Sequence, residues 1–123
     1  MSNSKKNWKS FGNKEESNKY ECFYCGERLN DWNRTTDHIV PKSKGGILSN
    51  DNKVYSCRRC NQLKGDHDPE TFLGMVKFIY KELNATHEEK VSYYNRVISR
   101  TGKMIREAKR NEEGTKDIKH SSQ

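Results

Sequence analysis

Two Cys-x-x-Cys pairs are the residues of this chain whose types and spacing point most directly to chemistry. Cys22 and Cys25 enclose two aromatic residues, and Cys57 and Cys60 enclose two arginines. Each such turn brings two thiolates to one side, so two turns can close a tetrahedral site. Thioredoxin-like redox chemistry would instead need one reactive pair in a βαβ setting. We therefore expect a closed, structural Zn²⁺ site on these four cysteines.

The segment between the two pairs is longer than a compact zinc ribbon needs, and it carries further polar residues. The candidates in and just after it are Asp37, His38, Asn52 and Asn61. Taken singly, each has an ordinary interpretation as a turn or cap residue or as a buried histidine with satisfied hydrogen bonds. Taken in order with the cysteines, they indicate a small zinc-stapled module with a metal-dependent phosphodiesterase site.

Short elements must position these residues. Residues 35–40 are mostly β-favouring and predict a strand. Residues 42–52 are rich in Gly, Ser and Asn and predict a surface loop, after which residues 53–56 supply a second strand. A helix is expected over residues 58–64, with Gly65 as its C-terminal cap.

Two further helices are predicted towards the C-terminus. Residues 68–70 (Asp-Pro-Glu) combine a capping side chain, a proline at the first helical position and an acid near the positive end of the dipole. Asn84 should end this helix, and Thr86 with Glu89 forms a capping box that opens the next one. Apolar residues recur at helical spacing along both, at Phe72, Val76, Ile79, Tyr80 and Leu83, and at Val91, Tyr94, Val97, Ile98 and Ile105.

The composition limits the module to one small domain. The chain has 123 residues, of which 30% are hydrophobic and 33% charged, so its core is modest and a bound zinc must supply part of the folding free energy. We expect a mobile basic arm at residues 1–19, the zinc module at 20–68, a helical extension at 69–110 and a frayed tail at 111–123.

The net charge of +7 points to a polyanionic partner, although charged flanks also keep a small protein soluble. The opening residues lack the apolar run of a signal peptide, and no stretch is apolar enough to span a bilayer. We therefore expect a cytoplasmic location without a membrane partner. In that reducing compartment, paired cysteines more often hold metal than form disulfides.

At this point the residues resemble the HNH endonucleases. The matching positions are Asp37-His38, Pro41, Gly45-Gly46, Asn52, Cys57-Arg58-Arg59-Cys60-Asn61 and Lys64-Gly65. The resemblance implies a ββα-metal core, often braced by a zinc on four cysteines. The fold class is therefore expected to be α+β: a small zinc-stapled ββα-metal core, HNH and treble-clef-like, with additional C-terminal helices.

The resemblance also implies a role for each matching polar residue. His38 would be the general base that takes a proton from the attacking water. Asp37 and Asn61 would bind one catalytic Mg²⁺ or Mn²⁺, because hard oxygen donors suit these ions. Asn52 would hydrogen-bond the loop or backbone near His38 and fix the orientation of its ring. Hydrolysis would leave 5′-phosphate and 3′-hydroxyl ends.

Several basic residues near this motif are candidates for contacts with nucleic acid: Lys42, Lys44, Arg58, Arg59 and Lys64. They could hold phosphates of double-stranded DNA, although an exposed helical charge explains those at residues 58–64 almost as well. DNA bound largely through its backbone is the expected partner. A phage, mobile-element or defence nuclease would show the same site, so the biological role stays open.

Two positions depart from the usual motif. Asn61 stands where a second histidine is common, and its neutral carbonyl binds metal more weakly than an imidazole does. Lys53 stands where many relatives have an apolar residue. Two alternatives to an active nuclease therefore stay open. One is a zinc-knuckle module that binds nucleic acid without cleaving it, and the other is a regulatory protein that has kept the fold but lost turnover.

Overall fold

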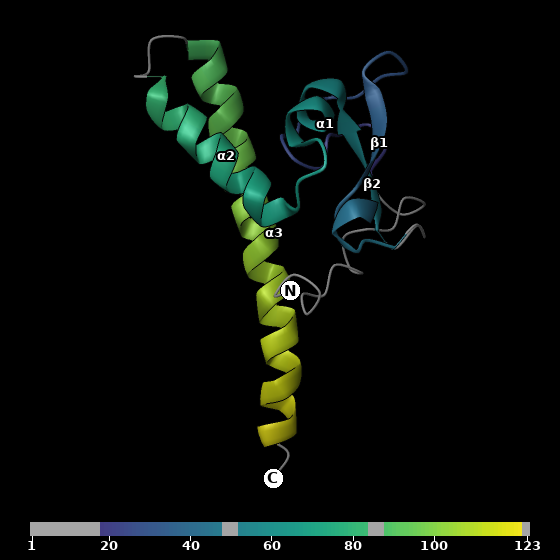
Figure 1. Cartoon of the computed structure of the whole chain (residues 1–123), viewed down its shortest axis with the longest axis vertical. Coiled ribbons are helices and arrows are strands. Elements are labelled where there is room, and N and C mark those ends of the chain that lie inside the picture. Colours follow the sequence, from purple (N-terminus) through teal and green to yellow (C-terminus); the bar gives the residue numbers. More distant parts are fainter. Residues whose placement is uncertain (1–17, 48–51, 84–87, 122–123) are drawn as a thin grey trace.

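The computed structural model describes residues 18–47, 52–83 and 88–121, with side chains described as far as residue 110. In chain order the elements are strand β1 (Arg34–His38), the short 3-10 helix η2 (Lys42–Lys44), strand β2 (Lys53–Cys57), and helices α1 (Arg58–Lys64), α2 (Pro69–Glu82) and α3 (Glu88–Ser121). This order confirms the expected α+β class, with a ββα unit followed by two helices (Figure 1).

The two strands form an antiparallel hairpin whose register decides which side chains are buried. Asp37 pairs with Val54, and both are buried, whereas His38 pairs with Lys53 and both are only half-buried. Because successive side chains of a strand point to opposite faces, Asp37 and His38 lie on opposite faces of the hairpin. The strand pair therefore directs the acid into the interior and the imidazole towards the other face.

β1 ends at His38, two residues earlier than the sequence predicts. The peptide N–H of Ile39 still donates to the carbonyl of Asn52 at 2.8 Å. At Val40, however, the N–H and the carbonyl both bond to the Asn52 side chain, at 3.0 and 2.8 Å. A side chain thus replaces the opposite strand as the partner of the backbone, and the ladder stops there.

The buried core is continuous from the cysteines to the long helices. Tyr24, between the first two cysteines, is fully buried and packs edge-on against Phe72 of α2, with ring centroids 5.4 Å apart. α2 and α3 lie side by side in Figure 1. On α3 the buried tyrosine is Tyr93, which is outside the predicted apolar stripe, and Tyr94 is half-buried. The members of this core are Cys22, Tyr24, Cys25, Leu29, Ile39, Val54, Cys57, Cys60, Phe72, Val76, Tyr93, Val97, Met104, Ile105 and Ala108.

Helix boundaries follow local capping chemistry. The Asp68 side chain accepts a hydrogen bond from the N–H of Thr71 at 2.8 Å, and Pro69 takes the first helical position of α2, as predicted. Gly65 follows α1 with a φ of 53°, and its N–H donates to the carbonyl of Asn61. The predicted helix end at Asn84 and the cap at Thr86 lie outside the described residues.

α3 continues to Ser121, beyond the residue at which we expected the helical extension to end. Side chains after residue 110 lie outside the description, so the expectation of a frayed tail stays untested. No helix in the described part of the chain is long and apolar enough to cross a membrane.

Candidate active site and zinc centre

The four cysteines come together as the spacing predicts. Their sulfur atoms all lie within 4.8 Å of one another, and all four residues are buried. The Sγ atoms of Cys25 and Cys57, one from each pair, are 3.8 Å apart. Tetrahedral Zn²⁺ with Zn–S bonds of about 2.3 Å places its sulfurs about 3.8 Å apart, so the cluster fits zinc.

Hydrogen bonds around the cluster suit thiolate sulfur. The peptide N–H groups of Cys25 and Cys60 each point at the first sulfur of their own pair, at 3.4 Å. The hydroxyl of Tyr93 lies 3.0 Å from the Cys60 sulfur and ties α3 to the cluster. Hydrogen bonds among the four thiols lower the pKa of Cys22 and raise the pKa of Cys25 and Cys60, so the cysteines titrate as one group. A zinc ion would complete this arrangement, since its ligands are deprotonated.

Asp37 is buried at the end of β1 and is held by two partners. The hydroxyl of Tyr24 donates to its Oδ2 atom at 2.5 Å, and the ammonium of Lys64 lies 3.1 Å from the same oxygen. Burial raises the pKa of this carboxyl, and the charge of Lys64 opposes the shift. Both contacts use the same carboxylate oxygen, Oδ2.

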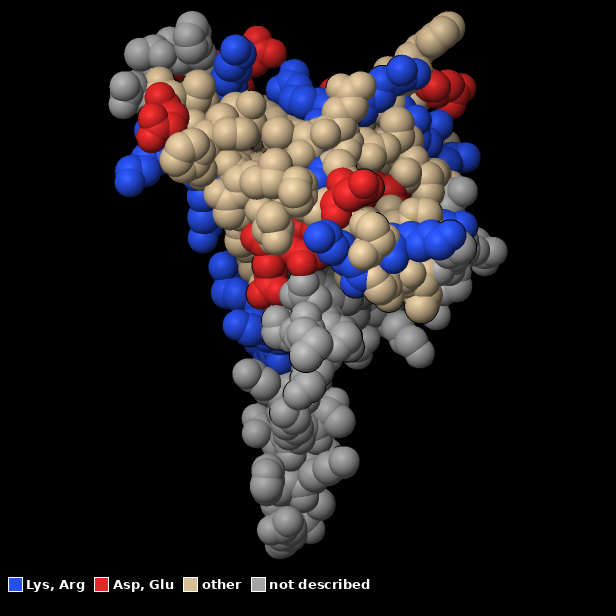
Figure 2. All heavy atoms as spheres, in the orientation of Figure 1, with Lys and Arg blue, Asp and Glu red and all other residues tan. Residues whose placement is uncertain are grey.

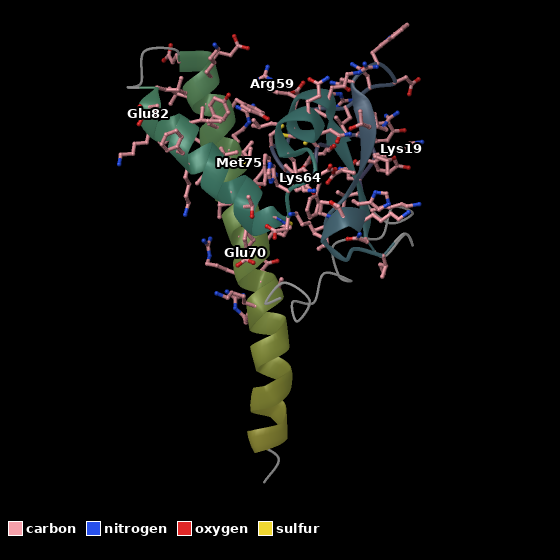
Figure 3. All side chains as sticks on the ribbon, in the orientation of Figure 1. Lys19, Arg59, Lys64, Glu70, Met75 and Glu82 are labelled. Carbon is pink, nitrogen blue, oxygen red and sulfur yellow. The ribbon has the colours of Figure 1, made fainter. Side chains whose placement is uncertain are left out.

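Lys64 is not the surface cation that the sequence suggests. Its side chain is 0% exposed, and Nζ also donates to the carbonyl of His38 at 2.8 Å. Figure 3 shows it at the end of α1, on the side facing the hairpin. Burial lowers its pKa, and Asp37 opposes that shift. A phosphate contact does not fit this position, because the ammonium is already bound inside the protein.

His38 is half-buried, and its Nε2 atom is one of two buried side-chain polar atoms without a hydrogen-bond partner among the described residues. An unpartnered buried nitrogen is unusual in a folded protein, and a catalytic role is one of its known explanations. The segment after it is fixed by Asn52, which bonds both backbone groups of Val40 and donates to the carbonyl of Ile47 at 2.9 Å. The Asn52 side chain therefore fixes the backbone at Val40, two residues after His38.

Gly45 and Gly46 of this loop are each required to be glycine for a different structural reason. At Gly46 an added Cβ would lie 1.7 Å from the carbonyl oxygen of Val40, so the close approach leaves no room for a side chain. At Gly45 there is open space, but its φ of 89° is one that other residues rarely adopt. The two glycines let the loop return tightly onto Asn52.

Asn61 lies on α1, which starts within the second cysteine pair and has Cys57 as its N-terminal cap. It is half-buried and stands three residues before Lys64, so both side chains lie on the same helix face. Because Lys64 reaches Asp37 and the His38 carbonyl, this face is turned towards the end of β1. α1 thus turns the face that carries Asn61 towards Asp37, while the imidazole of His38, the next residue of β1, points to the other face of the hairpin.

The other predicted nucleic-acid contacts have varied environments. Lys42 and Lys44 are exposed in η2. Arg58 is exposed and donates through Nε to the carbonyl of Trp32. Arg59 lies over the ring of Tyr93, 4.3 Å from its centroid, and so faces α3. Figure 2 shows positive side chains on the hairpin side and along α3, without a single dominant patch.

Sequence reasoning missed one residue of this site, Tyr24. The sequence marks it only as one of the two aromatic residues between Cys22 and Cys25, yet its hydroxyl donates to Asp37. A tyrosine inside a Cys-x-x-Cys turn was the available signal, because the turn faces the core and a buried phenol needs a hydrogen-bond partner.

Comparison with known proteins was informative for the zinc module. Residues 22–76 match the sequence profile of an HNH endonuclease family. The CRISPR-associated endonuclease Cas9 of Corynebacterium diphtheriae is 43% identical over 47 residues, which cover 37% of this chain and 4% of that protein. Among solved structures, the Type II-C Cas9 enzyme from Actinomyces naeslundii is 24% identical with a TM-score of 0.42, covering 67% of this chain and 10% of that one. The chain thus spans a small fraction of either relative.

Proposed function

We propose that this chain is a metal-dependent endonuclease that hydrolyses DNA. The match of residues 22–76 to the profile of an HNH endonuclease family and the similarity to a Cas9 endonuclease support a nuclease function. The observation that carries the proposal is the end of β1. There a buried, doubly held carboxylate stands next to a histidine whose Nε2 has no partner in the described part of the chain. A pure zinc-binding scaffold requires neither feature.

In this proposal His38 is the general base. Its Nε2 atom would take a proton from a water molecule that attacks the phosphorus. Asn52 holds the backbone at Val40 and so limits movement of the strand end on which His38 stands. The bond to the 3′ oxygen breaks, which leaves 5′-phosphate and 3′-hydroxyl ends.

Asp37 and Asn61 would hold one Mg²⁺ or Mn²⁺, whose chemistry is to stabilise negative charge on a phosphoryl group and its leaving oxygen. The protein's part is to hold the acid ready. Tyr24 and Lys64 fix Oδ2 of Asp37, and Oδ1 would be the oxygen that binds the cation. The zinc, bound by the four cysteines, would fix the start of α1 and with it Asn61.

The proposed substrate is double-stranded DNA, contacted mainly through phosphates. Lys42, Lys44 and Arg58 are exposed and could contact phosphates. Arg59 is also exposed, beside Tyr93. We also propose that residues 20–68 form the catalytic unit and that residues 69–110 support it. A reducing compartment such as the cytoplasm suits a site of four thiolates.

The test is incubation of the purified protein with supercoiled plasmid in Mg²⁺, in Mn²⁺ or in chelator. We expect cleavage or nicking with either ion, and its loss in His38→Ala while zinc content and thermal unfolding are retained. The matched control is His67→Ala, a half-buried histidine after α1 that is not part of the proposed site. Undiminished cleavage by His38→Ala would remove the general base from this account.

A second candidate is a module that binds nucleic acid without cutting it. The ion pair between Lys64 and Asp37 favours it, because the ammonium already neutralises the acid that should bind a cation. This candidate predicts binding without cleavage in any divalent metal. If instead Asn61→His creates or raises activity, then weak metal binding at Asn61 is the reason for low turnover.

A further inference from the structure

We infer that residues 30–33, here called the Trp32 turn, form a nucleic-acid contact in which the indole of Trp32 stacks on a base. The inference rests on the proposed function for the identity of the partner. Trp32 is 83% exposed, the largest fraction among the exposed large apolar side chains of the described residues. Phe78, at 65%, is the next.

The exposure does not result from a loosely built loop. The Asn30 side chain accepts hydrogen bonds from the N–H groups of Trp32 at 2.8 Å and Asn33 at 3.1 Å. In return, the Asn33 side chain accepts from the N–H of Asn30 at 2.7 Å. From the neighbouring helix, Arg58 donates to the Trp32 carbonyl at 2.8 Å. The backbone on both sides of the indole is therefore fixed, and a partner binds without first ordering it.

The surroundings of the turn are suited to a polyanion. Arg34 bonds to the Lys19 carbonyl at 2.6 Å and pairs with Asp31 at 2.8 Å, so it joins the Trp32 turn to the chain around Tyr20. Tyr20 is itself 54% exposed, with Lys19 and Arg34 near its ring. Arg28 and Arg58 add exposed positive charge. Two exposed aromatic rings among basic side chains match the combination by which proteins hold bases and phosphates.

A protein partner would also favour an exposed tryptophan, since tryptophan is enriched at interface hot spots. The charges decide between the two. The four basic residues Lys19, Arg28, Arg34 and Arg58 outnumber the two acids at the turn, Asp31 and Glu27. Of these acids, Asp31 is paired with Arg34. A nucleic-acid strand offers bases that can stack on the exposed rings and phosphates that can pair with these cations.

The position of the turn also fits a substrate that reaches the active site. β1 begins at Arg34, beside the turn, and ends at His38. These four steps span about 13 Å at the usual rise of a strand. At 3.4 Å per nucleotide of one duplex strand, this is about four nucleotides. A strand lying along β1 would therefore meet His38 and the Trp32 turn together.

The experiment uses the full chain with His38→Ala, which prevents cleavage, and Trp8→Phe, which leaves Trp32 as the single tryptophan. The probes are a single-stranded DNA 12-mer and its duplex. We expect the emission of Trp32 to be quenched on binding, and Trp32→Ala to weaken binding about 5- to 150-fold, the range of one lost base stack. The matched control is Phe78→Ala on α2, which should change affinity less than twofold. Zinc content verifies that each variant is folded.

If only the single strand quenches the Trp32 emission, Trp32 stacks on an unpaired base. If both probes quench it, Trp32 also stacks on a base of the duplex. The inference is overturned if neither probe binds. It is also overturned if binding leaves the Trp32 emission unchanged and Trp32→Ala binds as tightly as the parent, or if Trp32→Ala alters only self-association in sedimentation. Failure of the nuclease proposal looks different: plasmid stays intact in every metal while Trp32 is still quenched.

Discussion

Replacing Tyr24 by phenylalanine tests how the site holds its acid. The substitution removes the hydroxyl that donates to Asp37 and keeps the ring that packs edge-on against Phe72. Tyr24 is fully buried and Asp37 is 6% exposed, so water cannot replace the lost donor. A hydrogen bond to a charged group contributes about 1.5–3 kcal/mol, and we expect the free energy of unfolding to fall by about that amount.

The effect on metal binding should be larger than a packing defect explains. Burial raises the pKa of Asp37, and the Tyr24 hydrogen bond works against this shift, so its loss makes the carboxylate both less fixed and easier to protonate. Loss of a group that orients a metal ligand commonly costs about 10- to 100-fold in metal affinity. We expect a weakening in that range.

The assay is Mn²⁺ binding measured by electron paramagnetic resonance or calorimetry on zinc-loaded protein, alongside thermal unfolding. Tyr94→Phe is the control, because Tyr94 is a half-buried tyrosine on α3 that is remote from Asp37 in sequence and packs on Tyr93. Equal Mn²⁺ affinity for Tyr24→Phe and Tyr94→Phe would show that the Tyr24 hydroxyl does not orient Asp37 for metal binding.

Four further outcomes are expected. Lys64→Met should lower the free energy of unfolding by about 3–5 kcal/mol in urea titration, because it leaves Asp37 buried and unpaired; unchanged stability would contradict the buried pair. Elemental analysis should find one Zn²⁺ per chain, and its removal should unfold the module in circular dichroism, since structural zinc contributes about 10–16 kcal/mol. Asn52→Ala should lower kcat and leave the Mg²⁺ midpoint unchanged, because it frees the loop beside His38 without touching Asp37; a shifted midpoint would argue against this division of roles. Gly46→Ala should reduce thermal stability more than Gly45→Ala, because only at Gly46 would the new Cβ meet backbone; the reverse order would contradict the loop geometry.

The sequence predicts well those features that local chemistry decides. The cysteine spacing predicts the four-cysteine cluster, the β-favouring runs on either side of a glycine-rich loop predict the hairpin, and Asp68 with Pro69 predicts the start of α2. Each of these depends on residues close together in the chain or on a repeated motif.

What the sequence could not give depends on contacts between distant segments. Lys64 looks like an exposed helical cation until α1 packs on β1, where it meets an acid 27 positions earlier. The hydrogen bond from Tyr24 to Asp37 likewise forms only because the turn between Cys22 and Cys25 faces the end of β1. The buried face of α3 includes Tyr93 because a sulfur of the cluster and Arg59 lie against it. Helical periodicity alone does not contain these partners.

The most direct test of the central claim is the chemistry of the ends produced from supercoiled plasmid in Mg²⁺. The account predicts 5′-phosphate and 3′-hydroxyl ends, which DNA ligase can reseal without further treatment, and no product from His38→Ala with its zinc intact. Plasmid that stays supercoiled in both Mg²⁺ and Mn²⁺, or ends that ligase cannot join, would contradict it.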